Sequence, residues 1–229
     1  MAFVGAGMLY TGMDVEPVNE AEFNRWYDKE HMEERASIPG FLNTRRYTAL
    51  VGSPKYLNLY DTESVDTFSG PVYQKMLQNQ TDWSKRVMTY FHNFHRVVGR
   101  IDVSVGTGHG AVIGLVWINP VTGRQDELRK WFTEVGFAHL MENDDLVSAH
   151  ILESNPTLSG PPPGVEGSTD APPADDWFVI VEGTNEVAVA LACQERFAAR
   201  IFEDLGNATH VNFGVYALRC AFSKDNGMV

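Results

Sequence analysis

Residues 26 to 31 read WYDKEH and place four ionisable side chains, Asp, Lys, Glu and His, beside the rings of Trp26 and Tyr27. A histidine suits proton transfer near neutral pH, because its unperturbed pKa is about 6.5. On a helix, Tyr27 and His31 share a face, and Asp28 lies within reach of His31. A carboxylate on one imidazole nitrogen fixes the tautomer and raises basicity. The stretch therefore predicts acid–base catalysis by His31, oriented by Asp28, with Tyr27 supplying a hydroxyl.

The same stretch also fits an ordinary surface helix. The charge run continues from Glu33 to Arg35, as on a solvated helix face. A histidine near the C-terminal end of a helix can interact with the helix dipole and cap backbone carbonyls. A His31 that faces water would favour this structural interpretation, and a His31 that faces a cavity would favour catalysis.

The element that carries the stretch is a predicted helix with a recognisable start and end. Asn19 suits the N-cap position, and Glu22 three residues later resembles a capping box. Phe23, Trp26 and Tyr27 then recur at helical spacing and share one face. The Pro-Gly pair at 39–40 ends the helix.

A second copy of this pattern follows about 105 residues later, where ELRKWFTEVG corresponds to EFNRWYDKEH. In each half, strand-like runs and a second helical stretch follow in the order β-α-β-β-α-β. That order forms a four-stranded antiparallel sheet with two helices on one face. We predict an α+β fold in which residues 1–105 and 106–229 form two ferredoxin-like units with their sheets packed together.

The two predicted units differ where chemistry is expected. Val135 and Gly136 stand where the first unit has Glu30 and His31. This difference predicts one site per chain, in the first unit. The second unit also carries a proline- and glycine-rich stretch at 155–176, which predicts a long surface loop, either a lid or a passive insertion.

Further candidate residues lie on the predicted strands. Asn58 and Tyr60 point to one face of the third strand, and an asparagine among aromatic side chains needs a partner, which a ligand can supply. Arg45 and Arg46 face opposite ways, so one is expected to point inward and the other to lie at the surface. The candidate substrate-binding residues are Trp26, Arg46, Tyr47, Asn58, Tyr60 and His92.

Composition narrows the functional classes. The net charge of −12 argues against binding to nucleic acids or anionic membranes. No signal peptide or membrane-spanning run is recognisable, so a cytoplasmic protein is expected. His92 and His95 point to opposite faces of a strand and cannot share a metal ion. Dinucleotide, phosphate-loop and nucleophile-elbow motifs are missing, so no cofactor and no metal are expected.

Several short motifs together resemble the dimeric α+β barrel superfamily, near its EthD-type and antibiotic-monooxygenase-type branches. They lie within residues 14 to 64: WYD and EH in the stretch above, IPGF at 38–41, RRY at 45–47 and PKYL at 54–57. The resemblance implies that one chain forms the pseudo-dimer that single-repeat members build from two. It also implies a ligand site between helices and sheet.

The superfamily includes cofactor-free monooxygenases, isomerases, cyclases, dehydratases and haem-handling enzymes. With no cofactor motif, the resemblance favours a cofactor-independent lyase that cleaves a C–C or C–O bond, or a related isomerase or cyclase, acting on a small aromatic or polyketide-like compound. The alternatives are a monooxygenase, either cofactor-free or with haem held by His31, His92 or His95, and a non-catalytic ligand-binding or structural barrel. Internal pairing permits a homodimer without requiring one.

Overall fold

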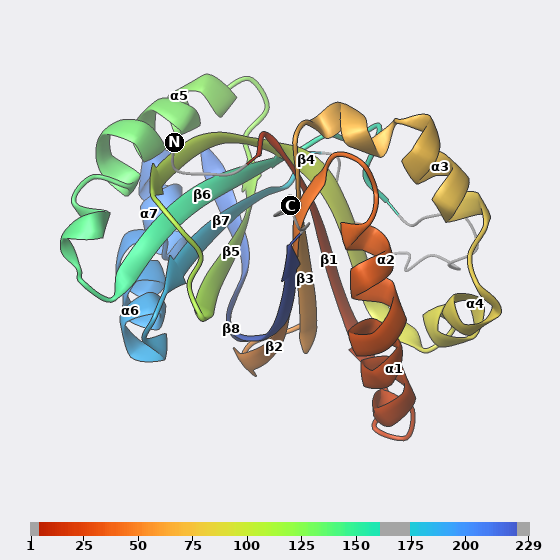
Figure 1. Cartoon of the computed structure of the whole chain (residues 1–229). Helices are drawn as coiled ribbons and strands as arrows, with labels where there is room; N and C mark the ends of the chain where they lie inside the picture. Colours follow the sequence, from red (N-terminus) through yellow and green to blue (C-terminus); the bar gives the residue numbers. More distant parts are fainter. Residues whose placement is uncertain (1–4, 161–174, 224–229) are drawn as a thin grey trace, which may run out of the picture.

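The chain forms a closed barrel of eight antiparallel strands (Figure 1), seen in a computed structural model that describes residues 5–160 and 175–223. Hydrogen-bonded neighbours follow the order β1-β3-β2-β8-β5-β7-β6-β4. The predicted α+β class with two antiparallel sheets joined as a barrel is confirmed. The strands are β1 (Gly7–Val15), β2 (Phe41–Val51), β3 (Tyr56–Thr62), β4 (Phe91–Gly106), β5 (Val112–Pro120), β6 (Leu146–Ser154), β7 (Trp177–Gly183) and β8 (Ala208–Ser223).

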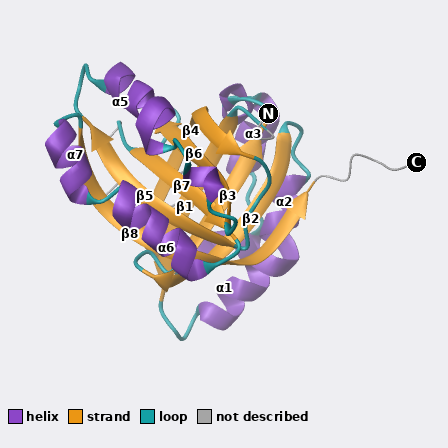
Figure 2. Ribbon diagram, turned by 90° about the vertical axis from the view of Figure 1, so that its left-hand side faces the viewer, coloured by secondary structure: helices purple, strands orange, loops and turns teal. Residues whose placement is uncertain are grey.

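Helices cover the outside of the barrel in two groups (Figures 1 and 2). The predicted order β-α-β-β-α-β is found in both halves, although the prediction missed α4. The division into two domains at residue 105 stays a prediction. The helices are α1 (Glu20–Trp26), α2 (Met32–Ala36), α3 (Pro71–Gln78), α4 (Asp82–Met88), α5 (Gln125–Trp131), α6 (Glu186–Arg196) and α7 (Ala199–Leu205), with short 3₁₀ turns η2 (Val65–Phe68) and η4 (Leu140–Glu142). In the described residues, no helix is long and apolar enough to span a membrane.

Each half contains a π-helical turn directly after its first helix. These are η1 (Tyr27–His31) and η3 (Phe132–Gly136). In η1 the N–H of Met32 donates to the carbonyl of Tyr27, five residues earlier, so the turn holds one residue more than an α-helical turn. Side chains on either side of such a turn leave the α-helical register. Asn19 occupies the predicted N-cap position, but its side chain makes no capping hydrogen bond.

Apolar side chains form three buried layers. One lies inside the barrel, and one lies between the sheet and the helices of each half. The halves join where β2 pairs with β8 and β4 pairs with β6. Because strand residues alternate in direction, neighbouring residues on one strand enter different layers.

The first part of the predicted loop at 155–176 crosses from the second half to the first. Beyond the last β4–β6 pair, Asn155 donates its N–H to the carbonyl of Val98 at 2.7 Å. The N–H of Gly160 donates to the carbonyl of Arg96 at 3.0 Å. Residues 161–174 lie outside the described part of the chain. The described segment lies along β4, beside the first-half layer.

Candidate active site

A narrow cavity lies between the helices and the sheet of the first half. It contains about 460 Å³ of empty space including its open mouth, but the centre of a water molecule can reach only about 40 Å³ of it. That is room for a few water molecules, so a larger ligand must displace wall side chains. The wall is formed by Leu9, Thr11, Trp26, Tyr27, His31, Arg35, Tyr60, Tyr73, Leu77, Gln80, Met88, Phe91, Phe94 and Arg96.

His31 faces this cavity and not the solvent, with 7% of its surface exposed. Its ring lies 4.2 Å from the ring of Trp26 and 5.1 Å from that of Tyr27, measured between centroids. Within the described residues, its Nδ1 has no hydrogen-bond partner, and a carboxylate oxygen of Glu34 lies 3.9 Å away. Burial, helped by the positive charge of Arg35, lowers the pKa of His31 well below 6.5. His31 is therefore neutral at pH 7 and able to accept a proton.

The hydroxyl of Tyr27 belongs to a small polar group at the back of the cavity. It accepts a hydrogen bond from Nδ2 of Asn58 at 3.2 Å and donates to the sulfur of Met13 at 3.7 Å. Nδ2 of Asn58 also donates to Oγ1 of Thr11 at 3.0 Å. Burial raises the pKa of Tyr27 to about 12, so its hydroxyl stays protonated. The prediction that Asn58 and Tyr60 face the same layer is confirmed.

Asp28 does not orient His31, contrary to the sequence prediction. Its Oδ1 lies 2.8 Å from Nη1 of Arg46, and its Oδ2 accepts from Arg219 at 3.4 Å. The π-helical turn places Asp28 on a different side from His31, which explains why α-helical spacing failed. Arg46 is also absent from the cavity wall, because it donates to Asn24 and lies over the ring of Tyr27 at 4.4 Å.

Two other predicted residues lie away from the cavity. Tyr47 follows Arg46 on β2 and therefore faces the barrel interior, where its hydroxyl accepts from Arg45 at 3.0 Å. His92 is exposed at the start of β4. Trp26 does line the cavity, and its indole N–H bonds to Oγ of Ser84 at 3.1 Å.

The sequence prediction did not include five polar residues of the wall, one of which is Thr11 on β1. Arg35 lies four residues after His31, so its spacing was a usable signal, but it was assigned to a solvated charge run. The other three come from elements whose approach to His31 depends on the closed barrel. These residues are Tyr73, Gln80 and Arg96.

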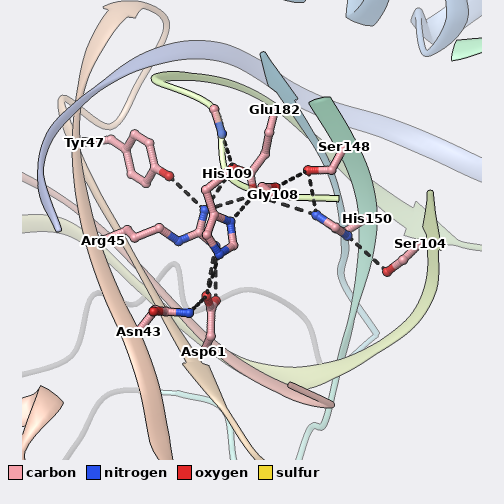
Figure 3. Close-up of polar contacts among 11 residues, drawn as sticks. Asn43, Arg45, Tyr47, Asp61, Ser104, Gly108, His109, Ser148, His150 and Glu182 are labelled. Carbon is pink, nitrogen blue, oxygen red and sulfur yellow. Dashed lines mark hydrogen bonds and ion pairs between the residues drawn. The ribbon is translucent and has the colours of Figure 1, made fainter. Parts of the chain in front are cut away.

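A second polar cluster lies inside the barrel and connects the two halves (Figure 3). Arg45 on β2 donates from Nη1 to Glu182 on β7 at 2.9 Å and from Nη2 to Asp61 on β3 at 3.1 Å. Both arginines of the Arg45–Arg46 pair are buried, so the prediction that one lies at the surface is wrong. The reason is that β2 is covered on both faces.

Histidines complete this barrel cluster. Nδ1 of His109 lies 3.3 Å from Glu182, and its Nε2 lies 3.7 Å from Asp61. His150 contacts Ser148 at 3.1 Å, and burial lowers the pKa of His150 to about 4. Burial alone would raise the pKa of Glu182, but the charge of Arg45 and the contacts of His109 and His150 together outweigh it, and the pKa falls to about 2.

The two clusters differ in which polar groups have partners, although Nε of Arg45 has none among the described residues. Both carboxylates of the barrel cluster accept hydrogen bonds from Arg45, as a structural link requires. In the described parts of the chain, no group of three or more His, Cys, Asp or Glu residues is placed to hold a metal ion. The first-half cavity instead leaves Nδ1 of His31 and Oε1 of Gln80 without partners among the described residues. That cavity is the candidate active site.

Comparison with known proteins supports the fold. No protein-family model and no curated protein matches the chain. An anthrone oxidase-like protein of known structure is 12% identical, with 96% of this chain and 93% of that chain covered and a TM-score of 0.63. A candidate monooxygenase from Lactobacillus acidophilus is 8% identical, with 96% and 97% covered and a TM-score of 0.58. A haem-binding protein from Thermus thermophilus is 11% identical, with 94% and 92% covered and a TM-score of 0.55. At these identities the likeness concerns the fold alone.

Proposed function

We propose that the first-half cavity is the active site of an oxygenase that uses dioxygen to oxidise a small aromatic compound, with neutral His31 as the base. One observation carries this proposal: a buried imidazole, whose Nδ1 has no hydrogen-bond partner among the residues that the structure describes, faces a cavity with aromatic walls. Two of the structures with the same fold are described as an anthrone oxidase-like protein and a candidate monooxygenase. Among the alternatives from the sequence, these names favour the monooxygenase over the lyase.

Once wall side chains have moved to admit the substrate, the cavity supplies the parts that such a reaction needs. His31 removes a proton from an acidic C–H next to the ring system, and the resulting carbanion gives its electrons to dioxygen. A CH₂ group becomes C=O in this way, and the second oxygen atom leaves as water. Tyr27 and Tyr60 line the same space. The hydroxyl of either can donate to a substrate oxygen, that of Tyr27 by giving up its weak hydrogen bond to Met13. Base catalysis of this kind contributes roughly 10²–10⁴-fold in rate.

The test is dioxygen consumption by wild type and His31→Gln with a panel of anthrones and hydroquinones. We expect the substitution to lower kcat/KM by roughly 10²–10⁴-fold. The matched control is His139→Gln, since His139 is exposed and lies outside the cavity. Because the pKa of His31 is lowered, the acid limb of the wild-type pH profile should lie below pH 6.5. Equal activity of wild type and His31→Gln would refute the role of His31.

The same panel without dioxygen tests the lyase, isomerase and cyclase alternatives. The proposed oxidation must stop under anaerobic conditions, because dioxygen is its electron acceptor. Turnover that continues at the aerobic rate, still dependent on His31, would show that the cavity performs proton transfer alone. That result would restore the reaction class first expected from the sequence.

Haem does not fit the cavity as it stands. The centre of a water molecule can reach only about 40 Å³, which is too little for a porphyrin, and the aromatic side chains of Trp26, Tyr60 and Tyr73 line that space. A haem-dependent version of the oxygenase would require these side chains to move apart. No step of the proposed reaction involves haem.

A further inference from the structure

We infer that the ligand of this cavity is an aromatic anion, whose negatively charged oxygen, a carboxylate or a phenolate, binds the guanidinium of Arg35. The inference rests on the proposed function for the location of the site and adds the chemical class of the substrate. It is carried by the charges in the cavity wall and by the contacts of three buried arginines.

Arg35 is a buried cation that donates no hydrogen bond to a carboxylate of the described residues. It lies on α2, is 5% exposed and lines the cavity. Its Nη1 contacts the sulfur of Met76, and a thioether is a weak acceptor. A carboxylate oxygen of Glu34 lies 3.8 Å away, beyond hydrogen-bonding distance. In the described residues, the guanidinium of Arg35 therefore has no strong acceptor.

The other buried arginines nearby show what Arg35 lacks. Arg45 donates to two carboxylates, at 2.9 and 3.1 Å, and Arg46 donates to Asp28 at 2.8 Å. The chain carries 30 acidic residues against 18 basic ones, so acidic partners are abundant overall. A buried charge without a hydrogen-bonded partner is unfavourable. An anionic ligand would give Arg35 the acceptor that the chain does not provide.

The remaining cation of the wall already has its partners. Arg96 donates from Nη1 to the carbonyls of Leu158 and Gly160, at 2.6 and 3.1 Å, and from Nη2 to the hydroxyl of Tyr73 at 3.2 Å. Among the described wall residues, Asp and Glu are both missing. The wall itself therefore carries two arginines and no carboxylate, and the carboxylate of Glu34 lies just outside it without a hydrogen bond to Arg35. Arg35 is the group placed to bind an anion.

The surroundings of Arg35 determine the rest of the ligand. Its charge acts on His31, Tyr27 and Tyr60, lowering the pKa of the imidazole and opposing the rise for both phenols. An oxygen bound at Arg35 thus holds the attached ring near the base. Aromatic side chains make up much of the wall, and their faces suit an aromatic ligand. These are Trp26, Tyr27, Tyr60, Tyr73, Phe91 and Phe94.

Calorimetric titration with four small probes tests this inference without any need for turnover. The probes are benzoate, 4-nitrophenolate at pH 8, neutral benzamide and cationic benzylamine. We expect one or both anions to bind wild type at least roughly tenfold more tightly than benzamide, as for charge-assisted hydrogen bonds. The stronger of the two anions identifies the preferred oxygen. Binding of benzamide or benzylamine as tightly as both anions would overturn the inference.

Variants locate the preference at Arg35. Arg35→Met should remove the preference for anions over benzamide. Arg35→Lys should keep part of this preference, since lysine retains the charge but not the planar fork of N–H donors. The matched control is Arg100→Gln, which removes a β4 arginine that pairs with Asp102 outside the cavity. An unchanged preference in Arg35→Met would overturn the inference. If Arg35→Met does not fold, Arg35→Lys decides the question. A weaker preference for the anion in Arg35→Lys than in wild type supports the inference, and an unchanged preference refutes it.

Failure of this inference and failure of the proposed function can be distinguished. His31→Gln retains Arg35, so it should still prefer the anion that wild type prefers over benzamide, even when dioxygen consumption is lost. Anion preference without oxidation by wild type would support the ligand class and reject the reaction. Oxidation of neutral compounds with equal binding of anions and benzamide would support the reaction and reject the ligand class.

Discussion

The two halves of the barrel carry different kinds of residue at matching positions of their paired strands, polar in the first half and apolar in the second. In the first half, Thr11 on β1 lies opposite Asn58 on β3. In the second half, Val116 on β5 lies opposite Val179 on β7. The first π-helical turn begins with a tyrosine and the second with Phe132. The polar group behind the first cavity therefore corresponds to apolar residues in the second half.

The second half also fills the space that His31 faces in the first. Its π-helical turn ends in Gly136, where an added Cβ would lie 2.9 Å from the ring of Trp131. Trp131 packs there against Phe132 and Phe202. An apolar core is the default for this layer, because burying unpaired polar groups is unfavourable. The half that departs from this default is the one expected to carry function.

The barrel interior shows the opposite relation, since there the halves are alike. Asp61 and Glu182 occupy matching positions on β3 and β7, and both accept hydrogen bonds from Arg45. His150 occupies on β6 the position that Arg45 has on β2. This similarity indicates a structural role for the barrel cluster, whereas the contrast between the helix layers indicates a chemical role for the cavity.

The largest expected effect on stability comes from Arg45→Met. This change leaves Asp61 and Glu182 buried without their main cation, which typically costs about 3–5 kcal/mol of unfolding free energy. Denaturant unfolding of both proteins measures the difference. The control is Arg219→Gln, whose ion pair with Asp28 is partly exposed, and we expect it to cost less than about 1 kcal/mol. A loss below 1 kcal/mol for Arg45→Met would show that the cluster is not a structural link.

The acid stability of wild type provides a second measurement of the same cluster. The pKa of Glu182 falls from 4.5 to about 2 in the folded protein, so the unfolded chain binds more protons between these values. The stabilisation is complete above pH 4.5 and is lost as the pH falls towards 2. In Arg45→Met the pKa of Glu182 should rise, so this part of the acid dependence should shrink or reverse.

We expect a smaller effect on stability, but a clear effect on activity, when the polar group of the first half is replaced by the apolar residues at the matching positions of the second half. The triple variant Thr11→Val, Tyr27→Phe and Asn58→Val replaces hydrogen-bonding partners together. Removing both partners of a buried hydrogen bond is often nearly neutral, so we expect a change within about 1 kcal/mol. Dioxygen consumption should fall more than roughly tenfold, as the hydroxyl donor is lost. Single Asn58→Val, which leaves Tyr27 without its donor, is the matched comparison and should be the less stable protein.

The comparison between halves also shows which features the sequence could predict. Alternation along strands correctly separated Arg45 from Arg46 and grouped Asn58 with Tyr60, because these relations depend only on local geometry. The offset of about 105 residues predicted a repeat, and the element order β-α-β-β-α-β is found in both halves. The partners of Arg45 could not be predicted, since Glu182 is 137 residues away and meets it only in the closed barrel.

Two errors in the predicted site have local physical causes. The π-helical turn changes the register between Asp28 and His31, and nothing in WYDKEH identifies such a turn. Arg35 was assigned to a solvated charge run, because a sequence does not show that α2 turns this residue towards the sheet. Both errors concern charged residues whose environment depends on tertiary packing.

The smallest effect on catalysis is expected for Asp28→Asn, and it separates the predicted arrangement from the observed one. Because Asp28 bonds to Arg46 and not to His31, kcat/KM should stay within about threefold of wild type. Arg46 keeps its hydrogen bond to Asn24, and Asp28 is partly exposed, so the stability cost should be about 1–2 kcal/mol. Steady-state kinetics and denaturant unfolding of the same preparation measure both quantities. A hundredfold loss of kcat/KM at unchanged stability would mean that Asp28 reaches His31 during turnover, and the orienting role predicted from WYDKEH would then be correct.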